Sequence, residues 1–391
     1  MNLSKRPSVY TLPSYSLTSD LLGYLRCGLQ YRYTRIGQLP SARPVQMWFG
    51  QFIHGVLEES YRRYNAAFSD GSPSLFPWSN DVITDICNLI KHRLSAQGLV
   101  PWDETLENLG DARAAVAIND LGPELFPLIH RAEVRLTGAR PLPINQIPPE
   151  FRFREADRYE MVGVIDVITH VEINDPSVHN NLVVQAILQA LPCDPPDHFE
   201  IIIDYKGMRR PPINPDNGVE GPSLWDIYNW QVQTYAHLRS THLDSLPILA
   251  GVIIYLNELL PTKSDLQTIQ RETNNHLTDV PALAEFNIPQ LIHQWQEESL
   301  TPILSLNYRL QRALRVIPVT PLSIQESLNQ FDHVVAQIET CRGREINQGH
   351  ILTTWEANSS DEDTCTRCDA RTYCPSYTNE NQPRLPGVRA H

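Results

Sequence analysis

The chain has 391 residues, of which 41% are apolar and 20% are charged, as expected for a globular protein with a sizeable core. It contains no run of 18 apolar residues and begins without an apolar secretion core, so we expect no membrane span and a cytoplasmic location. The formal net charge of −13 argues against a general nucleic-acid binder, whose surface should be basic. Seven cysteines, three of them crowded near the C-terminus, favour a metal or cluster site over a disulfide scaffold.

The first part of the chain predicts two helices. One begins at Leu17, and Cys27 lies late in it; a single cysteine in such a helix is more often a core residue than a ligand. The second runs from about Val45 to Ala66, with its apolar residues at helical spacing. On a different face, Gly50, His54 and Glu58 follow one another at steps of four, and Glu58 could be an ordinary surface acid or could orient His54.

The next long segment, residues 67–150, carries no chemical motif and is predicted to be mostly helical, forming a cap. Helices are expected from Asp81 to Ser95 and within Leu106–Leu136, and the prolines at 141–149 predict a linker. Phe151–Ile173 then predicts a hairpin whose second strand carries Asp166. The segment 174–198 is interpreted as an insertion, with a helix from Val183 to Leu191, between two adjacent strands.

A buried strand is predicted at Ile201–Ile203, because three β-branched residues follow one another there. It continues into Asp204, Tyr205 and Lys206. Side chains alternate along a strand, so Asp204 and Lys206 point the same way. A buried carboxylate beside an ammonium needs a partner: either the two form a structural ion pair, or they serve a divalent metal and a phosphate.

The remainder of the chain is read in the same way. Arg209 and Arg210 lie in a predicted loop and could either meet phosphate or be solvated. A helix over Leu224–Arg239 places Gln231 and Tyr235 one turn apart, and Ile248–Leu256 predicts a further buried strand. Residues 263–345 are predicted to be mostly helical, with a last helix starting at Ser323, and Cys341 just past that helix is a possible rival ligand. The cysteine segment 365–375 and a tail at 376–391 complete the chain.

Several of these stretches together resemble the PD-(D/E)XK nucleases, specifically the RecB-like branch. The resemblance is carried by Gly163-Val-Ile-Asp166 and Asp204-Tyr-Lys206. Further agreement comes from Gly50-Gln-Phe-Ile-His54, from Gln231-Val-Gln-Thr-Tyr235, and from a cysteine set of Cys27, Cys365, Cys368 and Cys374. It spans residues 17–375 as a single nuclease domain. The chain departs from the pattern in that Asp166 and Asp204 are 38 residues apart, and in Gly28, where proline often follows the cysteine.

The resemblance implies an α/β fold of the restriction-endonuclease type, with a central mixed sheet flanked by helices, helical insertions and a C-terminal segment clamped by an iron–sulfur cluster. It implies that His54, Asp166, Asp204 and the backbone carbonyl of Tyr205 hold Mg²⁺ or Mn²⁺. Asp166, Asp204 and Lys206 would be catalytic, with Lys206 positioning a water or stabilising developing charge. Gln231 and Tyr235 would lie along the substrate cleft.

The cysteine set is similar to that of the iron–sulfur members, the CRISPR-associated RecB-type exonucleases and the AddB-type helicase–nucleases. It implies a [4Fe–4S] cluster held by Cys27, Cys365, Cys368 and Cys374, with a structural role. A zinc site remains the alternative for the CxxC spacing. Cys193, inside the insertion, is not expected to be a ligand.

The implied function is a metal-dependent deoxyribonuclease, an exonuclease acting on single-stranded DNA ends. The chain has no phosphate loop of the Gly-x-x-x-x-Gly-Lys-Ser/Thr type, so a helicase or a CRISPR integrase would act in trans. An alternative is a catalytically weak DNA-end-binding subunit of a larger DNA-processing or CRISPR adaptation complex. A third possibility is RNA processing.

Overall fold

The structure is a computed structural model. It describes residues 11–39, 47–71, 76–176, 178–192, 194–213, 223–281, 288–296, 300–358, 362–366, 368–371 and 374–377. Cys193, most of the loop after Lys206 and nearly all of the predicted C-terminal tail therefore lie outside the described residues.

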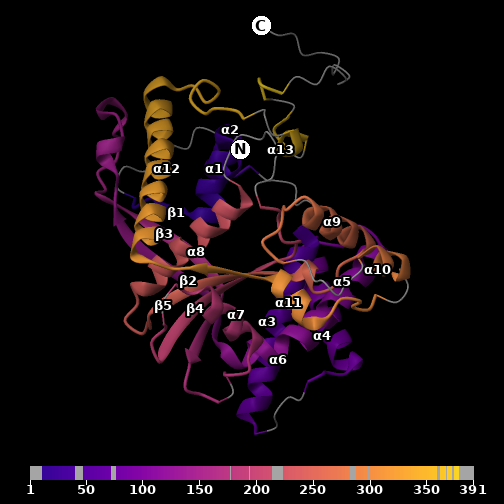
Figure 1. Cartoon of the computed structure of the whole chain (residues 1–391). Helices are drawn as coiled ribbons and strands as arrows, with labels where there is room; N and C mark the ends of the chain where they lie inside the picture. The colour runs from indigo at the N-terminus through magenta and orange to yellow at the C-terminus, as the bar shows by residue number, and fades with distance from the viewer. Residues whose placement is uncertain are drawn as a thin grey trace, which may run out of the picture. The chain divides into compact units, whose positions relative to one another are not determined.

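A mixed sheet of six strands forms the centre of the fold (Figure 1). Its order is β1-β3-β4-β5-β6, with β2 also paired to β3. β3 and β4 are antiparallel, β4 and β5 are parallel, and β5 and β6 are antiparallel. The strands are β1 (Ser14–Ser16), β2 (Ile129–Pro141), β3 (Arg158–Glu172), β4 (His198–Lys206), β5 (Ile248–Tyr255) and β6 (Leu314–Pro318).

Helices cover the sheet, and several have clear sequence signals. α8 begins with a capping box, in which Ser223 and Asp226 exchange hydrogen bonds with each other's backbone amides. The helices are α1 (Leu22–Arg26), α2 (Gly28–Tyr31), α3 (Met47–Ser69), α4 (Asn80–Ala96), α5 (Glu104–Val116), α6 (Gly122–Leu125), α7 (Leu182–Ala190), α8 (Leu224–Ser240), α9 (Lys263–Asn274), α10 (Ile288–Gln294), α11 (Leu306–Ala313), α12 (Pro321–Gln348) and α13 (Glu362–Thr366). The predicted α/β class with a central mixed sheet flanked by helices is confirmed.

The two faces of the sheet bury different helices. On β5, Val252 and Ile254 join the large apolar core that contains residues of α3, α4 and α5. The alternate residues Ile253 and Tyr255 pack against α8. Because successive side chains on a strand point to opposite faces, the sheet separates α8 from the α3 group. The predicted ligands and catalytic side chains come from both of these helix layers and from the strands between them.

The segments 67–150 and 263–345 are mostly helical, as predicted, although the first also contains the long strand β2 and the second the short strand β6. Two other secondary-structure predictions were wrong. Phe151–Ile173 is not a hairpin: β3 alone occupies its second part, and β3 pairs with β2, the strand that precedes it in the chain. α12 begins at Pro321 rather than Ser323, because the Thr320 hydroxyl accepts the Ser323 amide at 3.1 Å and proline suits the first helical turn. α12 also ends later than predicted, at Gln348, so Cys341 lies within the helix and not just past it.

The chain forms two compact units. The first comprises Met1–Ala42, Ala139–Glu160 and Gln330–His391, and the second comprises Arg43–Gly138 and Met161–Asn329. The prediction of a single nuclease domain stays a prediction.

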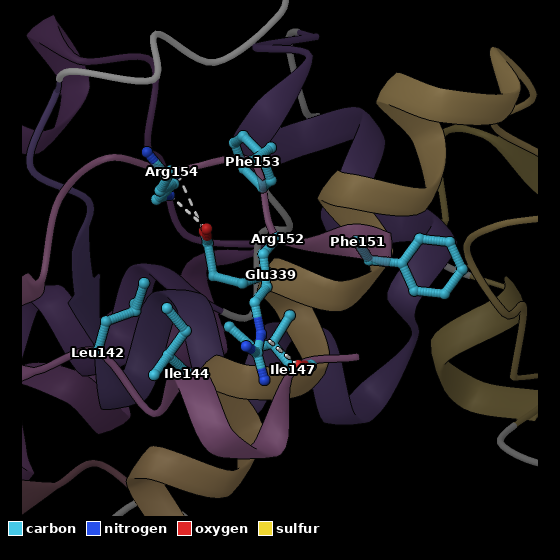
Figure 2. A pocket seen from close by; sticks show the side chains of 8 residues that line it. All are labelled: Leu142, Ile144, Ile147, Phe151, Arg152, Phe153, Arg154 and Glu339. Atoms are coloured by element: carbon cyan, nitrogen blue, oxygen red, sulfur yellow. Dashed lines mark hydrogen bonds and ion pairs between the residues drawn. The ribbon is translucent and has the colours of Figure 1, made fainter. Parts of the chain in front are cut away.

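The first unit is held by ion pairs to the C-terminal part of α12. Arg154 and the Tyr15 hydroxyl both reach Glu339, and Arg32 Nη2 pairs with Glu345 Oε1 at 2.6 Å. A small pocket lies beside Glu339, and Figure 2 shows Arg154 pointing to that carboxylate across it. The pocket is lined by Leu142, Ile144, Ile147, Phe151, Arg152, Phe153, Arg154 and Glu339. All eight belong to the first unit, so this pocket contains none of the predicted site residues.

Candidate active site

The candidate site lies in the second unit, where α3 closely approaches the residue that follows β4. A Cβ atom placed on Gly207 would lie 3.1 Å from Gly50 Cα and 3.2 Å from the Phe49 ring. Glycine at 207 therefore permits the approach, and Gly50 leaves its own side of the helix clear. As a result His54, one turn beyond Gly50, reaches the end of β4.

His54 contacts two of the predicted site residues. Its Nε2 lies 2.9 Å from the Tyr205 carbonyl oxygen, and its Nδ1 lies 3.4 Å from Asp166 Oδ2. A carbonyl oxygen only accepts, so Nε2 carries the proton. Burial lowers the pKa of His54, against the opposing charge of Asp204, and this keeps the ring neutral. The unprotonated Nδ1 therefore presents a lone pair towards a carboxylate oxygen, an arrangement that a cation between them would stabilise.

Glu133 joins this pair, although no pattern in the sequence pointed to it. His54, Glu133 and Asp166 each offer one ligand atom, and these three atoms lie within 4.8 Å of one another. No other group of three such side chains meets this distance among the described residues. Glu133 has φ 51°, in the left-handed region that is uncommon for a residue with a side chain and is concentrated at functional sites. β2 therefore contributes a carboxylate at a strained position.

The two carboxyl groups are poor places for negative charge without a cation. Burial and the charge of Asp204 raise the pKa of Asp166 to about 8, although the Tyr205 amide donates to Asp166 Oδ2 at 2.8 Å. Burial and the charge of Asp166 raise the pKa of Glu133 to about 7. The Glu133 side chain is itself exposed to solvent, and the neighbouring charge of Asp166 acts on it there. A divalent ion would remove both penalties.

Asp204 and Lys206 lie side by side, as their alternation along β4 predicts. Lys206 Nζ is 2.5 Å from Asp204 Oδ2, donates to Gln231 Oε1 at 3.3 Å and lies 4.9 Å from the centre of the Tyr228 ring. Asp204 is only 4% exposed, and its Oδ2 accepts no hydrogen bond. The ion pair is thus the sole compensation seen for this buried oxygen among the described residues, which leaves it able to bind a cation.

Gln231 and Tyr235 contact the acid from α8. Gln231 Nε2 donates to Asp204 Oδ1 at 2.9 Å and to the Tyr235 hydroxyl at 3.2 Å. Both side chains are buried. The Tyr235 ring also packs on β3, where a Cβ at Gly163 would lie 2.8 Å from Tyr235 Cε1. Gln231 therefore bridges Asp204 and Lys206, and Tyr235 packs against the glycine of the Gly163–Asp166 motif.

The residues present suit a divalent ion. Nitrogen and carboxylate oxygen are ligands of Mn²⁺, and Mg²⁺ accepts the oxygens. The His54 Nδ1 to Asp166 Oδ2 separation of 3.4 Å is close to the spacing of two neighbouring ligands on one ion. The Tyr205 carbonyl, a predicted ligand, accepts from His54 here and keeps a second lone pair. Three of the predicted ligand residues, His54, Asp166 and Tyr205, thus contact one another, and Glu133 joins His54 and Asp166. Asp204 contacts Lys206 and Gln231 and lies outside this group of ligand atoms.

The two arginines that follow Lys206 are engaged elsewhere. Arg209 Nη2 pairs with Glu272 Oε2 at 3.1 Å. Arg210 pairs with Asp279 and donates to the Leu314 carbonyl at 2.8 Å. Both side chains anchor the chain after β4, so neither of the two roles considered from the sequence, a phosphate contact or a solvated loop, describes them.

The four predicted cluster cysteines all belong to the first unit. Cys27 interrupts the N-terminal helix and accepts the Gln30 amide on its sulfur at 3.4 Å. Burial raises the pKa of the Cys368 thiol, and the charges of Cys27 and Cys374 raise it further. Among the described residues, however, no three cysteine sulfurs lie within 4.8 Å of one another.

Two further residues, Gly28 and Cys341, were compared with the pattern of the cysteine set. A Cβ on Gly28 would lie 3.1 Å from the Glu356 carbonyl oxygen, and Leu29 N donates to that same oxygen at 2.9 Å. This close approach explains why glycine follows Cys27. The Cys341 sulfur lies 3.6 Å from the Tyr24 hydroxyl oxygen.

Comparison with known proteins gives one family match, which covers parts of both units. Residues 18–179 match the model of the PD-(D/E)XK nuclease superfamily. The match covers less than half of the chain; it includes His54, Glu133 and Asp166 and ends before Asp204. It suggests a metal-dependent nuclease. No curated protein matches the chain. Among the described residues, none of the helices has the length and apolar character that crossing a membrane requires.

Proposed function

We propose that this protein is a metal-dependent deoxyribonuclease that hydrolyses phosphodiester bonds at single-stranded DNA ends. The observation that carries the proposal is the convergence of His54 Nδ1, Glu133 and Asp166 beside the Asp204–Lys206 pair. The carboxylates suit a cation and the Lys206 ammonium suits a phosphate, whereas a purely structural core would not need charges of both signs at this spacing.

Each side chain has a chemical task in this proposal. Bound Mg²⁺ or Mn²⁺ supplies Lewis acidity and lowers the pKa of a water. His54, Glu133, Asp166 and Asp204 hold that ion, and the hydrogen bond from His54 Nε2 to Tyr205 fixes the ring so that Nδ1 faces it.

Lys206 is the group that meets the substrate. The Lys206 ammonium, beside Asp204, would hold the attacking water or a phosphate oxygen. Gln231, bonded to both side chains, limits how far either can move. The water loses a proton as its oxygen bonds to phosphorus, the bond to the departing deoxyribose oxygen breaks, and that oxygen takes up a proton.

The preference for DNA ends rests on the sequence resemblance to RecB-type exonucleases, not on a contact in the structure. The same resemblance supports a [4Fe–4S] cluster on Cys27, Cys365, Cys368 and Cys374, with zinc as the alternative. A cytoplasmic location would keep these thiols reduced. A helicase or integrase acting in trans would supply single-stranded ends.

A catalytically weak end-binding subunit is the second candidate, and the net charge of −13 favours it, because such a surface binds DNA poorly without a partner. An assay with end-labelled and circular DNA, single- and double-stranded, in Mg²⁺ or Mn²⁺ separates the two. We expect cleavage of linear single strands, sparing of circles, and loss of cleavage on adding a chelator. Binding without cleavage in either ion would favour the second candidate, and preference for RNA would overturn the substrate.

A further inference from the structure

Three histidines stand in a row across three neighbouring strands of the second unit. They are His130 on β2, His170 on β3 and His198 on β4, and all three are exposed. The His130 and His170 ring centroids are 6.1 Å apart, and those of His170 and His198 are 5.8 Å apart. The proposed nuclease mechanism uses none of them.

The strand register places an acid in the same row. On the β3–β4 pair, Glu172 is opposite His198 and Glu200 is opposite His170, so these four side chains share one face of the sheet. Glu200 is already bound by Arg239, at 2.7 and 2.8 Å. Glu172 is exposed at the end of β3. The face therefore presents imidazoles beside one carboxylate.

We propose that His130, His170 and His198, with Glu172, form a binding site for one transition-metal ion of the Zn²⁺ type. Three imidazoles on one tetrahedral ion would have ring centroids roughly 5 Å apart, given metal–nitrogen distances of about 2 Å. The two spacings between adjacent rings exceed that value by about an ångström, and the outer rings, His130 and His198, must also close the wider gap across β3. Neighbouring strands are about 4.8 Å apart, so the two outer rings can lean towards the central one.

The rings do not converge on one point as they stand. Within the described part of the chain, their nitrogens do not form a group within 4.8 Å. Because the three side chains are exposed, rotation about their χ angles brings the nitrogens inward without disturbing the core. The site thus closes only around its ion.

The chemistry of this site differs from that of the acidic site. Imidazole suits Zn²⁺, Cu²⁺ and Ni²⁺, whereas Mg²⁺ prefers oxygen, so the two sites select different ions. The ion would join β2, β3 and β4, the strands that carry Glu133, Asp166 and Asp204. A bound ion would therefore hold these strands in register and raise the stability of the sheet.

Zn²⁺ titration by calorimetry tests the proposal on the full chain with its native cofactor content. We expect the wild type to bind one Zn²⁺ more than His170→Ala, with a dissociation constant below about 10 µM, and the additional ion to raise the melting temperature. His130→Ala and His198→Ala should each weaken this binding at least about tenfold. His92→Ala, an exposed histidine on α4, is the matched control and should bind as the wild type does.

A second arm separates this site from the nuclease site. His54→Ala should keep the additional Zn²⁺ while losing cleavage, and His170→Ala should lose it while keeping cleavage in Mn²⁺. Substitution by Co²⁺ should give weak visible bands without the intense absorption of a thiolate ligand. Equal Zn²⁺ stoichiometry in the wild type and His170→Ala overturns the proposal, and so does an additional site that disappears in His54→Ala. Neither result depends on which nucleic acid is cleaved.

Discussion

The acidic group of the second unit and the cysteine set of the first unit differ in how far they are organised without an ion. One ligand atom each of His54, Glu133 and Asp166 lie within 4.8 Å of one another, whereas no three described cysteine sulfurs do. The acidic ligands stand on a long helix and on paired strands, whose backbone hydrogen bonds hold them in place. Cys27 lies between the short helices α1 and α2, and Cys365 lies in the five-residue helix α13. We expect the acidic site to bind its ion reversibly, and the cluster proposed above to tie the cysteine segments together.

The largest effect is expected at the preorganised site. Asp204→Asn keeps the shape of the side chain and removes its charge, so cleavage should fall by at least about 10³-fold, or about 4 kcal/mol of transition-state stabilisation. Initial rates in Mn²⁺ on labelled single strands measure it. Asp85→Asn, an exposed acid on α4, is the control and should retain full activity. An active Asp204→Asn protein would remove this acid from the mechanism.

The cysteine set should show the opposite behaviour. Cys27→Ala should abolish the brown colour expected of a cluster and lower the free energy of unfolding by about 3 kcal/mol, similar to losing a cross-link between distant segments. Anaerobic purification, visible absorbance and thermal melting measure both. Cys341→Ala should keep the colour. A colourless wild-type protein with one equivalent of zinc would replace the cluster by a zinc site.

Lys206 tests whether the ion pair is catalytic or structural. Lys206→Met should lower kcat by about 10²-fold, or about 2.7 kcal/mol, with little change in Mn²⁺ affinity, because the lysine contacts substrate and not the ion. Lys263→Met on α9 is the matched control. If Lys206→Met cleaved at the wild-type rate but melted earlier, the pair would serve the fold alone.

The packing behind the acids should matter less. Gly163→Ala places a methyl group 2.8 Å from the Tyr235 ring and should cost about 1–3 kcal/mol of stability. A Cβ at Gly50 meets no atom within 4 Å, so Gly50→Ala is a suitable comparison for stability. Chemical denaturation measures both. Equal stability of the two variants would show that Tyr235 moves aside freely.

The smallest expected effect is a pH dependence. The pKa of Asp166 is raised to about 8, so its proton must leave when a cation binds. Between about pH 7 and 8, Mn²⁺ affinity should rise about tenfold per pH unit, and it should level off above pH 8. Below about pH 7 the rise should be steeper, because the proton of Glu133 must leave as well. The stability of the ion-free protein changes with pH in the opposite direction. The contribution that the raised pKa of Asp166 makes to the free energy of unfolding is complete below about pH 4 and is lost as the pH rises through about 8. Mn²⁺ should therefore raise the melting temperature more at pH 8.5 than at pH 6, and an equal rise at both would contradict the assignment.

The parts of the site that the sequence predicted are those with a strong local pattern. Ile201–Ile203 leading into Asp204 and Lys206 is a buried strand with a charged end, and β4 has that form. The apolar spacing around His54 predicted α3 within three residues at each end. Even the separation of 38 residues between the two acids is accommodated, because α7 and its loops join the antiparallel neighbours β3 and β4.

Glu133 could not have been found in the same way. The segment Ile129–Pro141 mixes charged and apolar residues and follows a helical run, so it was interpreted as more helix. Its role depends on pairing with β3, a contact between residues distant in sequence. The positive φ of Glu133 is likewise imposed by the surrounding fold and leaves no mark on residue type, since glycine or asparagine would be the usual signal.

The most direct test of the account is the position of a bound Mn²⁺ ion in crystals soaked with the metal, located by its anomalous scattering. We predict one peak in the second unit, within about 2.5 Å of His54 Nδ1 and of an Asp166 oxygen, and close to Asp204 and Glu133. A peak elsewhere, or these side chains unmoved and without an ion at saturating Mn²⁺, would contradict it.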